Sequence, residues 1–270
     1  MTIGRNRRED EMLTLKNPAR ERLQNGELAI GIGLRQARTV DAALALKTCG
    51  FDWLFIDLEH GAMGLDTAVQ ISVAALVAGI SPLVRVPRGR YDLAARALDG
   101  GAYGIVMPHV DTAEEAREIV SHLKFPPAGH RSITGAMPQL AFRSAPLAEA
   151  AAAVNENVLI VAMLETPEAI ANADAIAAVP GIDVLLIGTN DLTCEMGIPG
   201  ELMHERVGAA YETMVAACRK RGKWAGMGGV YSEEGLRRYI ELGAQMVLAG
   251  SDLSFLMAAG QARTKMLRGI

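Results

Sequence analysis

The amino-acid sequence predicts an α/β fold, a (β/α)8 barrel of eight parallel strands. Eight short, almost wholly apolar runs alternate with Ala- and Leu-rich stretches, which is the pattern of a parallel sheet covered by helices. The 270 residues match the length of a typical barrel domain, and 50% of them are hydrophobic, enough for a large core. A doubly wound open sheet is the competing architecture, but the sequence has neither a GxGxxG turn nor a P-loop to support it.

We expect a single barrel domain over residues 28–270, preceded by a tail and lead-in over residues 1–27. The basic segment GRNRRED at residues 4–10 is short and balanced by acids, which is typical of a solvated tail. The strands are expected at residues 28–33, 53–57, 82–86, 103–108, 158–164, 184–188, 223–227 and 246–250. Helices fill the gaps: TVDAALALKTCG stops at Gly50, and DTAEEAREIVSHLKF has Asp111 or Thr112 as its N-cap.

Two segments depart from this rhythm. Residues 125–147 are rich in Gly, Pro and Ser and carry Arg131 and Arg143, and a loop of this length is usually a lid or an interface segment. Because it lies between the fourth and fifth strands, we expect it over the active face. Residues 251–270 form an amphipathic helix with exposed Phe and Met, which either closes the barrel, the favoured alternative, or packs on a neighbouring subunit.

Composition excludes several classes of protein. The net charge of -4 and the absence of a long Lys/Arg run argue against nucleic acid and membrane surfaces as partners. Three widely spaced cysteines without a CxxC motif suggest a reducing compartment and no thiolate metal site. No apolar run of about 18 residues is present. We therefore expect a cytoplasmic protein.

Two carboxylates, Glu165 and Asp191, each stand just past a buried strand. The carboxyl ends of barrel strands are where chemistry is done, and neighbouring strands lie roughly 4.8 Å apart. Both carboxylates could therefore hold one hard divalent cation through oxygen ligands. The alternative is local: Glu165 would begin a helix ahead of Pro167, and Asp191 would cap the helix that follows. Two acids in succession at equivalent places favour the cation.

The second strand ends in FIDLEHG, which brings Asp57, Glu59 and His60 to the same face. A histidine titrates near neutrality, and a neighbouring carboxylate can orient its ring, so His60 is the candidate base. The alternative is a surface histidine after a turn.

Arg85 interrupts the apolar third strand, PLVRVPR. A guanidinium in a barrel mouth is costly unless it pairs with an anion. That anion is either a substrate carboxylate or developing enolate, or else Asp57 or Glu59 in a buried ion pair.

Several motifs together resemble the metal-dependent class II 2-oxo-acid aldolases of the HpcH/HpaI family, which includes 4-hydroxy-2-oxoheptanedioate and 2-dehydro-3-deoxyglucarate aldolases. The resemblance runs from about Gly31 to Leu256. It is carried by GFDWLFIDLEHG, LVRVP, LDGGAYGIVMPHVDTAEEA, FPPAGHRS and ETPEAIANADAIAAVPGIDVLLIGTNDL. It implies a TIM barrel of the phosphoenolpyruvate/pyruvate type that assembles as a homohexamer with exchanged C-terminal helices.

The resemblance also implies roles for individual residues. Glu165 and Asp191 would bind the metal, Mg2+ or Mn2+ with Co2+ or Zn2+ as further candidates. His60 would be the base, Arg85 would stabilise the enolate, and Asp57 would support the water on the metal. Asp99 of LDGGA would reach His60 from an adjacent subunit. Backbone N–H groups near Gly188 and Asn190, beside Asp191, would hold the substrate carboxylate together with Arg85.

These residues predict an aldolase that reversibly cleaves a 4-hydroxy-2-oxo acid into pyruvate, or a related 2-oxo acid, and an aldehyde. The alternative is another enolate-forming carbon–carbon lyase or synthase, such as an oxaloacetate decarboxylase or a siderophore-type citrate synthase. A non-catalytic barrel would be expected to lack at least one of four residues, and the sequence has them all: His60, Arg85, Glu165 and Asp191. Met163, Thr189 and the Gly228–Gly229 pair depart from the family pattern and affect the expected specificity.

Overall fold

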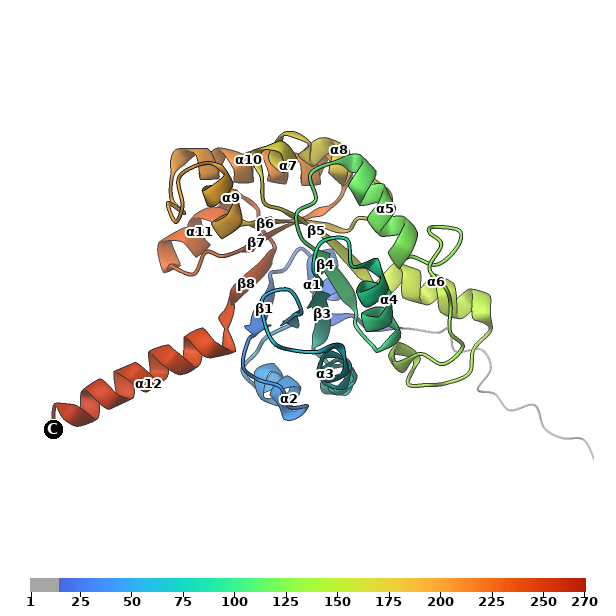
Figure 1. Cartoon of the computed structure of the whole chain (residues 1–270), viewed down its shortest axis with the longest axis horizontal. Helices are drawn as coiled ribbons and strands as arrows, with labels where there is room; N and C mark the ends of the chain where they lie inside the picture. Colours follow the sequence, from blue (N-terminus) through green and yellow to red (C-terminus); the bar gives the residue numbers. More distant parts are fainter. Residues whose placement is uncertain (1–14) are drawn as a thin grey trace, which may run out of the picture.

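Eight parallel strands close into a barrel in the computed structural model, which describes residues 15–270. Each strand pairs with its neighbours in chain order, and β8 pairs with β1, so the predicted (β/α)8 fold is confirmed (Figure 1). The strands are β1 (Ala29–Leu34), β2 (Trp53–Asp57), β3 (Ser81–Arg85), β4 (Gly104–Met107), β5 (Leu159–Leu164), β6 (Val184–Gly188), β7 (Trp224–Gly228) and β8 (Met246–Ser251). Every predicted strand end falls within one residue of these bounds. The segment GRNRRED lies outside the described residues.

Most of the helices surround the barrel on its outer side (Figure 1). The helices of the described residues are α1 (Pro18–Gln24), α2 (Asp41–Thr48), α3 (Leu65–Ala78), α4 (Tyr91–Asp99), α5 (Ala113–Leu123), α6 (Leu147–Asn157), α7 (Pro167–Ala171), α8 (Ala173–Ala177), α9 (Thr189–Glu195), α10 (Glu205–Arg221), α11 (Glu233–Leu242) and α12 (Asp252–Arg268). Thr112 caps α5 in a capping box with Glu115, and Gly50 follows α2 with a φ of 94°, as the sequence predicted for both helix boundaries. In the part of the chain that the structure describes, none of the helices has the length and apolar character to cross a membrane.

The barrel interior is filled by apolar side chains rather than open as a channel. Trp53 is fully buried there, and its indole N–H donates to the Ala29 carbonyl at 3.1 Å. Gly31 makes room for that indole, since a Cβ at this position would lie 2.1 Å from a ring carbon. Helix α1 places Ala19 and Leu23 beneath these side chains, and the Ala19 N–H donates to Ser81 at the start of β3. Chemistry is therefore confined to the opposite, carboxyl end of the strands.

Residues 125–147 do not lie over the active face of their own barrel, so that expectation is wrong. The segment follows helix α5 rather than a strand, and loops after helices lie at the amino end of the strands. There Gln139 donates to the Leu98 and Ala102 carbonyls, and Arg131 lies 2.6 Å from Asp99.

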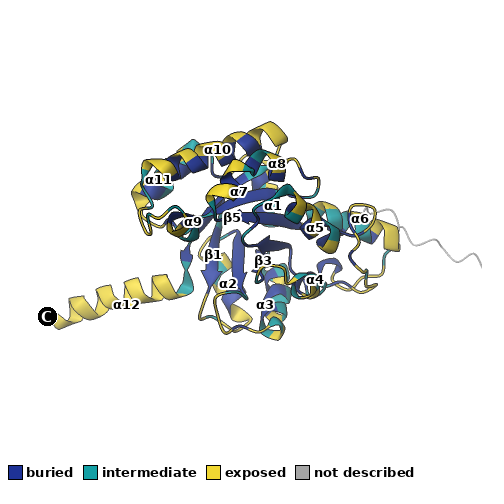
Figure 2. Cartoon of the chain, turned by 45° about the horizontal axis from the view of Figure 1, so that its top comes forward, coloured by how far each residue is buried: buried dark blue, intermediate teal, exposed yellow. Residues whose placement is uncertain are grey.

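The expectation that the C-terminal helix closes the barrel is also wrong. Helix α12 projects away from the body of the molecule, and none of its residues is buried (Figures 1 and 2). Its first turn is held by a capping box between Ser251 and Ser254, and Phe255 stacks on Phe51 with ring centroids 6.2 Å apart. Beyond that point, Leu256, Met257 and other apolar side chains face solvent.

Candidate active site

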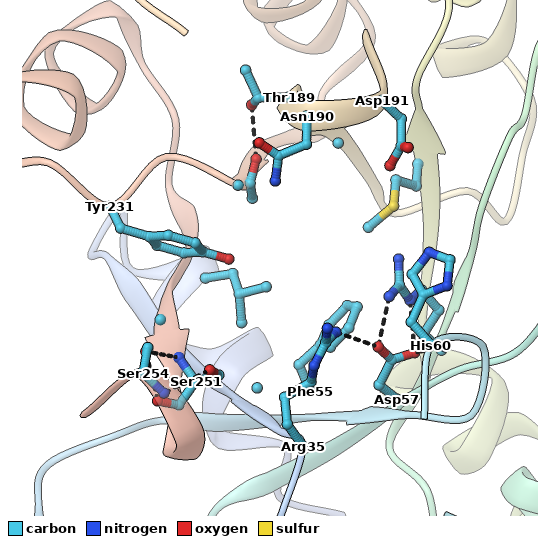
Figure 3. A pocket seen from close by; sticks show the side chains of 18 of the residues that line it. Arg35, Phe55, Asp57, His60, Thr189, Asn190, Asp191, Tyr231, Ser251 and Ser254 are labelled. Carbon is cyan, nitrogen blue, oxygen red and sulfur yellow. Dashed lines mark hydrogen bonds and ion pairs between the residues drawn. The ribbon is translucent and has the colours of Figure 1, made fainter. Parts of the chain in front are cut away.

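A cavity of about 520 Å3 opens at the carboxyl ends of the barrel strands. Its wall is formed at or just beyond the ends of every strand except β4 (Figure 3). The lining residues are Gly33, Arg35, Phe55, Asp57, His60, Arg85, Met163, Glu165, Gly188, Thr189, Asn190, Asp191, Gly228, Gly229, Tyr231, Leu248, Gly250, Ser251, Leu253 and Ser254. The cavity thus gathers all the predicted site residues apart from Asp99.

Asp57 and Arg85 end two adjacent strands and are direct register partners. Arg85 Nε and Nη2 donate to the two Asp57 carboxylate oxygens at 3.0 and 2.6 Å, and Arg85 Nη1 lies 3.2 Å from Glu59 Oε2. Burial raises the pKa of Asp57, but Arg85 and the backbone N–H groups of Glu59 and His60 hold that pKa below its ordinary value. The buried ion pair, which was one alternative for Arg85, is therefore confirmed.

The ion pair does not exhaust the donors of Arg85. A guanidinium carries five N–H groups, and its three nitrogens each use one of them on a carboxylate here. One N–H group on Nη1 and one on Nη2 stay available at a residue that lines the cavity. Asp57 therefore fixes the guanidinium plane while leaving it able to bind an anion.

His60 stands at the rim of the cavity. Its side chain is 57% exposed, its Nε2 lies 3.9 Å from Glu59 Oε2, and its backbone N–H donates to Asp57. Figure 3 shows the imidazole above the Asp57 carboxylate. The turn after β2 is thus held by the same carboxylate that orients Arg85, which couples the positions of the two side chains.

Glu165 and Asp191 meet inside the cavity, at the ends of β5 and β6. Glu165 is 1% exposed, and its Oε2 accepts the backbone N–H of His109 at 2.8 Å. Burial raises the pKa of Glu165 to about 8, with a further upward contribution from Asp191. Thr166, not Glu165, caps helix α7, so the local alternative for Glu165 is wrong. Asp191 does lie in the first turn of α9, but Gly188 rather than Asp191 is the N-cap.

This donor set fits a hard divalent cation. A pair of carboxylates suits Mg2+ or Mn2+, which keep several waters and accept further oxygen ligands from substrate. Within residues 15–270, no group of three or more His, Cys, Asp or Glu side chains is arranged around one point to enclose a metal. Mg2+ bound through only one or two carboxylates keeps coordination positions that substrate oxygens can fill. Such a cation would offset the negative charges of the buried Glu165 and of Asp191 beside it.

Gly188 is required by the position of Glu165. A Cβ at residue 188 would lie 2.5 Å from Glu165 Oε1, closer than any side chain tolerates. The next residue, Thr189, points away from the cavity centre, donating to the Gly228 carbonyl at 2.7 Å and lying 2.8 Å from the Tyr211 hydroxyl. Thr189, which departs from the family pattern, thus links the residue after β6 to the end of β7. Met163, which also departs from that pattern, is buried and lines the cavity.

Asp99 lies far from the cavity of its own chain, at the end of helix α4. Its carboxylate is 42% exposed and accepts a hydrogen bond from Arg131 at 2.6 Å. Within one chain the structure does not bring Asp99 to His60, so a joint role requires a second subunit.

Several lining residues were not predicted from the sequence. Arg35 follows β1 directly, Tyr231 lies three residues beyond β7, and Ser251 and Ser254 flank the start of α12. Each stands at the carboxyl end of a strand, the same signal that identified Glu165. His109, just after β4, was also missed; its Nδ1 lies 3.4 Å from Glu165, and its backbone has a positive φ of 51°.

The sequence matches the HpcH/HpaI aldolase/citrate lyase family over residues 36–259. The chain belongs to this family. The match covers most of the chain and includes both carboxylates of the candidate metal site. The family resemblance seen in the sequence is thereby confirmed, and with it the assignment of the chain as a carbon–carbon lyase.

Individual relatives agree with the assignment. The 4-hydroxy-4-methyl-2-oxoglutarate aldolase of Hapsidospora irregularis is 40% identical over 255 residues, which cover 92% of this chain and 93% of that protein. An HpcH/HpaI aldolase from Desulfitobacterium hafniense superposes with a TM-score of 0.88 at 29% identity, over 93% of this chain and 96% of that one. The citrate synthase SbnG superposes with a TM-score of 0.82 at 27% identity, over 94% of this chain and 100% of that one.

Proposed function

We propose that this chain is a divalent-metal-dependent aldolase that reversibly cleaves a 4-hydroxy-2-oxo acid into pyruvate, or a related 2-oxo acid, and an aldehyde. The observation that carries the proposal is the meeting of Glu165 and Asp191 in a cavity that also holds His60 and Arg85. The similarity to an aldolase of a 4-hydroxy-2-oxo acid supports the substrate class. The cysteine pattern supports a cytoplasmic site of action.

Each side chain has a distinct task in the cleavage. A divalent cation held by Glu165 and Asp191 would polarise the keto oxygen of the substrate as a Lewis acid. His60 accepts the proton of the C4 hydroxyl, the C3–C4 bond breaks, and its electron pair forms the enolate of the 2-oxo acid while C4 becomes a carbonyl carbon. The free N–H groups of Arg85 stabilise the enolate oxygen, and a proton delivered to C3 completes pyruvate. In the synthetic direction the steps reverse.

The substrate carboxylate has its own binding position in this proposal. Helix α9 begins at the cavity wall, and Gly188 caps it without a side-chain hydrogen bond. The backbone N–H groups near Gly188 and Asn190 could therefore donate to the carboxylate next to the keto group.

Removal of the metal tests the proposal. The chelated enzyme should lose aldol cleavage, and Mg2+, Mn2+ or Co2+ should restore it, because an all-oxygen site discriminates poorly among these ions. Cleavage can be measured as pyruvate release from a panel of 4-hydroxy-2-oxo acids. Activity that resists chelation and is abolished by borohydride in the presence of pyruvate would contradict the proposal and indicate a Schiff base instead.

A second candidate uses the same enolate chemistry. The similarity to a citrate synthase favours a decarboxylase of oxaloacetate or a condensing synthase as the alternative. Analysis of products formed from oxaloacetate would separate the two functions, since only this second candidate predicts efficient turnover of oxaloacetate in the absence of an aldehyde and of a 4-hydroxy-2-oxo acid.

The proposal includes a homo-oligomer, a hexamer by family resemblance, in which neighbouring chains exchange C-terminal helices and Asp99 of one chain orients His60 of another. The unburied apolar side chains of α12 and the exposed Asp99 carboxylate support it. Mixed oligomers of Asp99→Ala and His60→Ala subunits should recover part of the activity that each variant lacks, because some interfaces then contain both wild-type groups. Confirmed mixed oligomers without any recovery, or a fully active monomer, would show that Asp99 is an ordinary helix-end residue.

A further inference from the structure

We propose that Arg35 and Tyr231 form a carboxylate-binding subsite that selects substrates with a second carboxylate at the far end of the carbon chain. In the synthetic direction this subsite would favour acceptors such as oxo acids over neutral aldehydes. The inference rests on the proposed function, because it assumes that the 2-oxo end of the substrate lies at Glu165 and Asp191.

Among the cations that line the cavity, Arg35 has the most unused hydrogen-bond donors. Its side chain is 44% exposed, and among the described residues its one ion pair is a 3.4 Å contact from Nη1 to Asp57. Arg85, by contrast, is 8% exposed and is held by Asp57 and Glu59 through all three nitrogens. Most of the five N–H donors of Arg35 are therefore free for a ligand, and a guanidinium binds a carboxylate through two parallel hydrogen bonds.

Tyr231 offers a second donor on the same side. Its ring extends from the loop after β7 with the hydroxyl directed into the cavity (Figure 3). Burial raises the pKa of Tyr231, while a backbone hydrogen bond from Gly229 and then the charges of Arg35 and Arg85 oppose that rise. The pKa stays above its ordinary value, so the hydroxyl keeps its proton at neutral pH and lies within the field of both cations. In the capping box of α12, the Ser254 hydroxyl donates to the Ser251 carbonyl and the Ser251 hydroxyl oxygen accepts the Ser254 N–H.

The loop that carries Arg35 is held in place by Asp252, the first residue of helix α12. The Asp252 carboxylate accepts the backbone N–H groups of Arg35, Gln36 and Ala37 at 2.8, 2.9 and 2.6 Å. Three hydrogen bonds from consecutive residues fix the direction in which the chain leaves β1. Asp252 is thus a positioning residue for Arg35.

The position of Arg35 matches the far end of an extended substrate. Figure 3 shows Arg35 and Asp191 at opposite sides of the cavity, with Tyr231 projecting between them from a third side. A cavity of about 520 Å3 accommodates a small diacid that spans this distance. Three carboxylates line the cavity, so a second anionic group of the substrate needs a cation of its own, and Arg35 supplies it.

Binding of unreactive substrate analogues tests the subsite. The pairs 2-oxoglutarate with 2-oxopentanoate, and 2-oxoadipate with 2-oxohexanoate, differ in the terminal carboxylate and lack the 4-hydroxyl group needed for cleavage. Calorimetry on the Mg2+-loaded enzyme should show tighter binding of the diacid in at least one pair, by about ten- to hundredfold, as expected for hydrogen bonds to a charged group. Arg35→Gln should bring that ratio close to one, and Arg35→Lys should give an intermediate ratio.

Arg38→Gln is the matched control, since it removes the same charge from the same loop at a residue that is exposed and does not line the cavity. It should leave the ratio at the wild-type value. Equal binding of diacid and monoacid by the wild-type enzyme would overturn the inference. If Arg35→Gln lowers the affinity for diacid and monoacid equally, the inference is also overturned, and Arg35 is a structural partner of Asp57.

Kinetics separate this inference from the proposed function. With pyruvate as donor, Arg35→Gln should lower kcat/KM for glyoxylate about ten- to hundredfold, mainly through KM, while kcat/KM for acetaldehyde changes less than about threefold. Wild-type aldol activity without any preference for carboxylated acceptors would refute the subsite alone. A diacid preference in binding without aldol activity toward any acceptor would refute the proposed function and leave the carboxylate subsite in place.

Discussion

Glu165→Gln and Asp191→Asn should each abolish divalent-cation binding while the barrel stays folded. Both substitutions keep the shape of the side chain but remove one of the two anionic ligands, and the third carboxylate of the cavity, Asp57, is already paired with Arg85. Glu165→Gln also keeps an oxygen that accepts the His109 N–H. Aldol cleavage should fall by at least about 10³-fold, the upper range for loss of one electrostatic stabiliser. Mn2+ binding by calorimetry and thermal unfolding by circular dichroism measure the two effects separately.

A third variant displaces the Glu165 carboxylate without removing its charge. Gly188→Ala retains both acids but places a methyl group where Glu165 Oε1 now lies, so it should also weaken Mn2+ binding. Gly228→Ala is its control in the same cavity, because a Cβ there meets its nearest neighbour at 3.6 Å, an ordinary contact. Wild-type Mn2+ affinity in both Glu165→Gln and Asp191→Asn would remove the basis of the metal site.

The barrel could be predicted closely because strand burial is a local property of the sequence. Each strand of a closed parallel barrel is covered on both faces, so it appears as an uninterrupted apolar run such as VLLIG at residues 184–188. The run also fixes which end of the strand carries the chemistry. Glu165 and Asp191 followed directly from this pattern, without knowledge of any contact.

Features that depend on contacts between distant parts of the sequence, or on how far a side chain reaches, could not be predicted in the same way. Helix α12 carries large apolar side chains such as Leu256 and Met257, which predicted a packed helix, but none of its residues is buried. The position of residues 125–147 between the fourth and fifth strands does not by itself show at which end of the barrel they lie. Because the segment follows helix α5, it lies at the amino end of the strands. Arg35 was not identified from the sequence, because the Asp252 carboxylate that holds its backbone N–H lies 217 positions away along the chain.

The partner of Arg85 was left open for a similar reason. Sequence offers Asp57, Glu59 or a substrate anion, and only the register that sets Asp57 opposite Arg85 decides among the protein groups. The ion pair and the catalytic role do not exclude each other, because two N–H groups of Arg85 stay free. A substitution at Arg85 therefore affects both stability and turnover, and an experiment must separate them.

Arg85→Ala should lower turnover about 10²- to 10³-fold and destabilise the fold by about 3–5 kcal/mol. The stability loss arises because Asp57, which is 2% exposed, keeps its charge but loses its bidentate partner, and Arg35 at 3.4 Å compensates only in part. Denaturant unfolding measures the loss of stability, and kcat measures the loss of turnover.

The double substitution Asp57→Asn with Arg85→Met distinguishes the two roles of the pair. It removes both buried charges and fills most of the volume of the arginine stem, so the free energy of unfolding should recover at least half of the loss seen in Arg85→Ala. Turnover should stay low, because no donor replaces the guanidinium at the enolate oxygen. If turnover recovers together with stability, Arg85 acts only by holding the turn after β2 in place, and the enolate must be stabilised by other groups of the cavity.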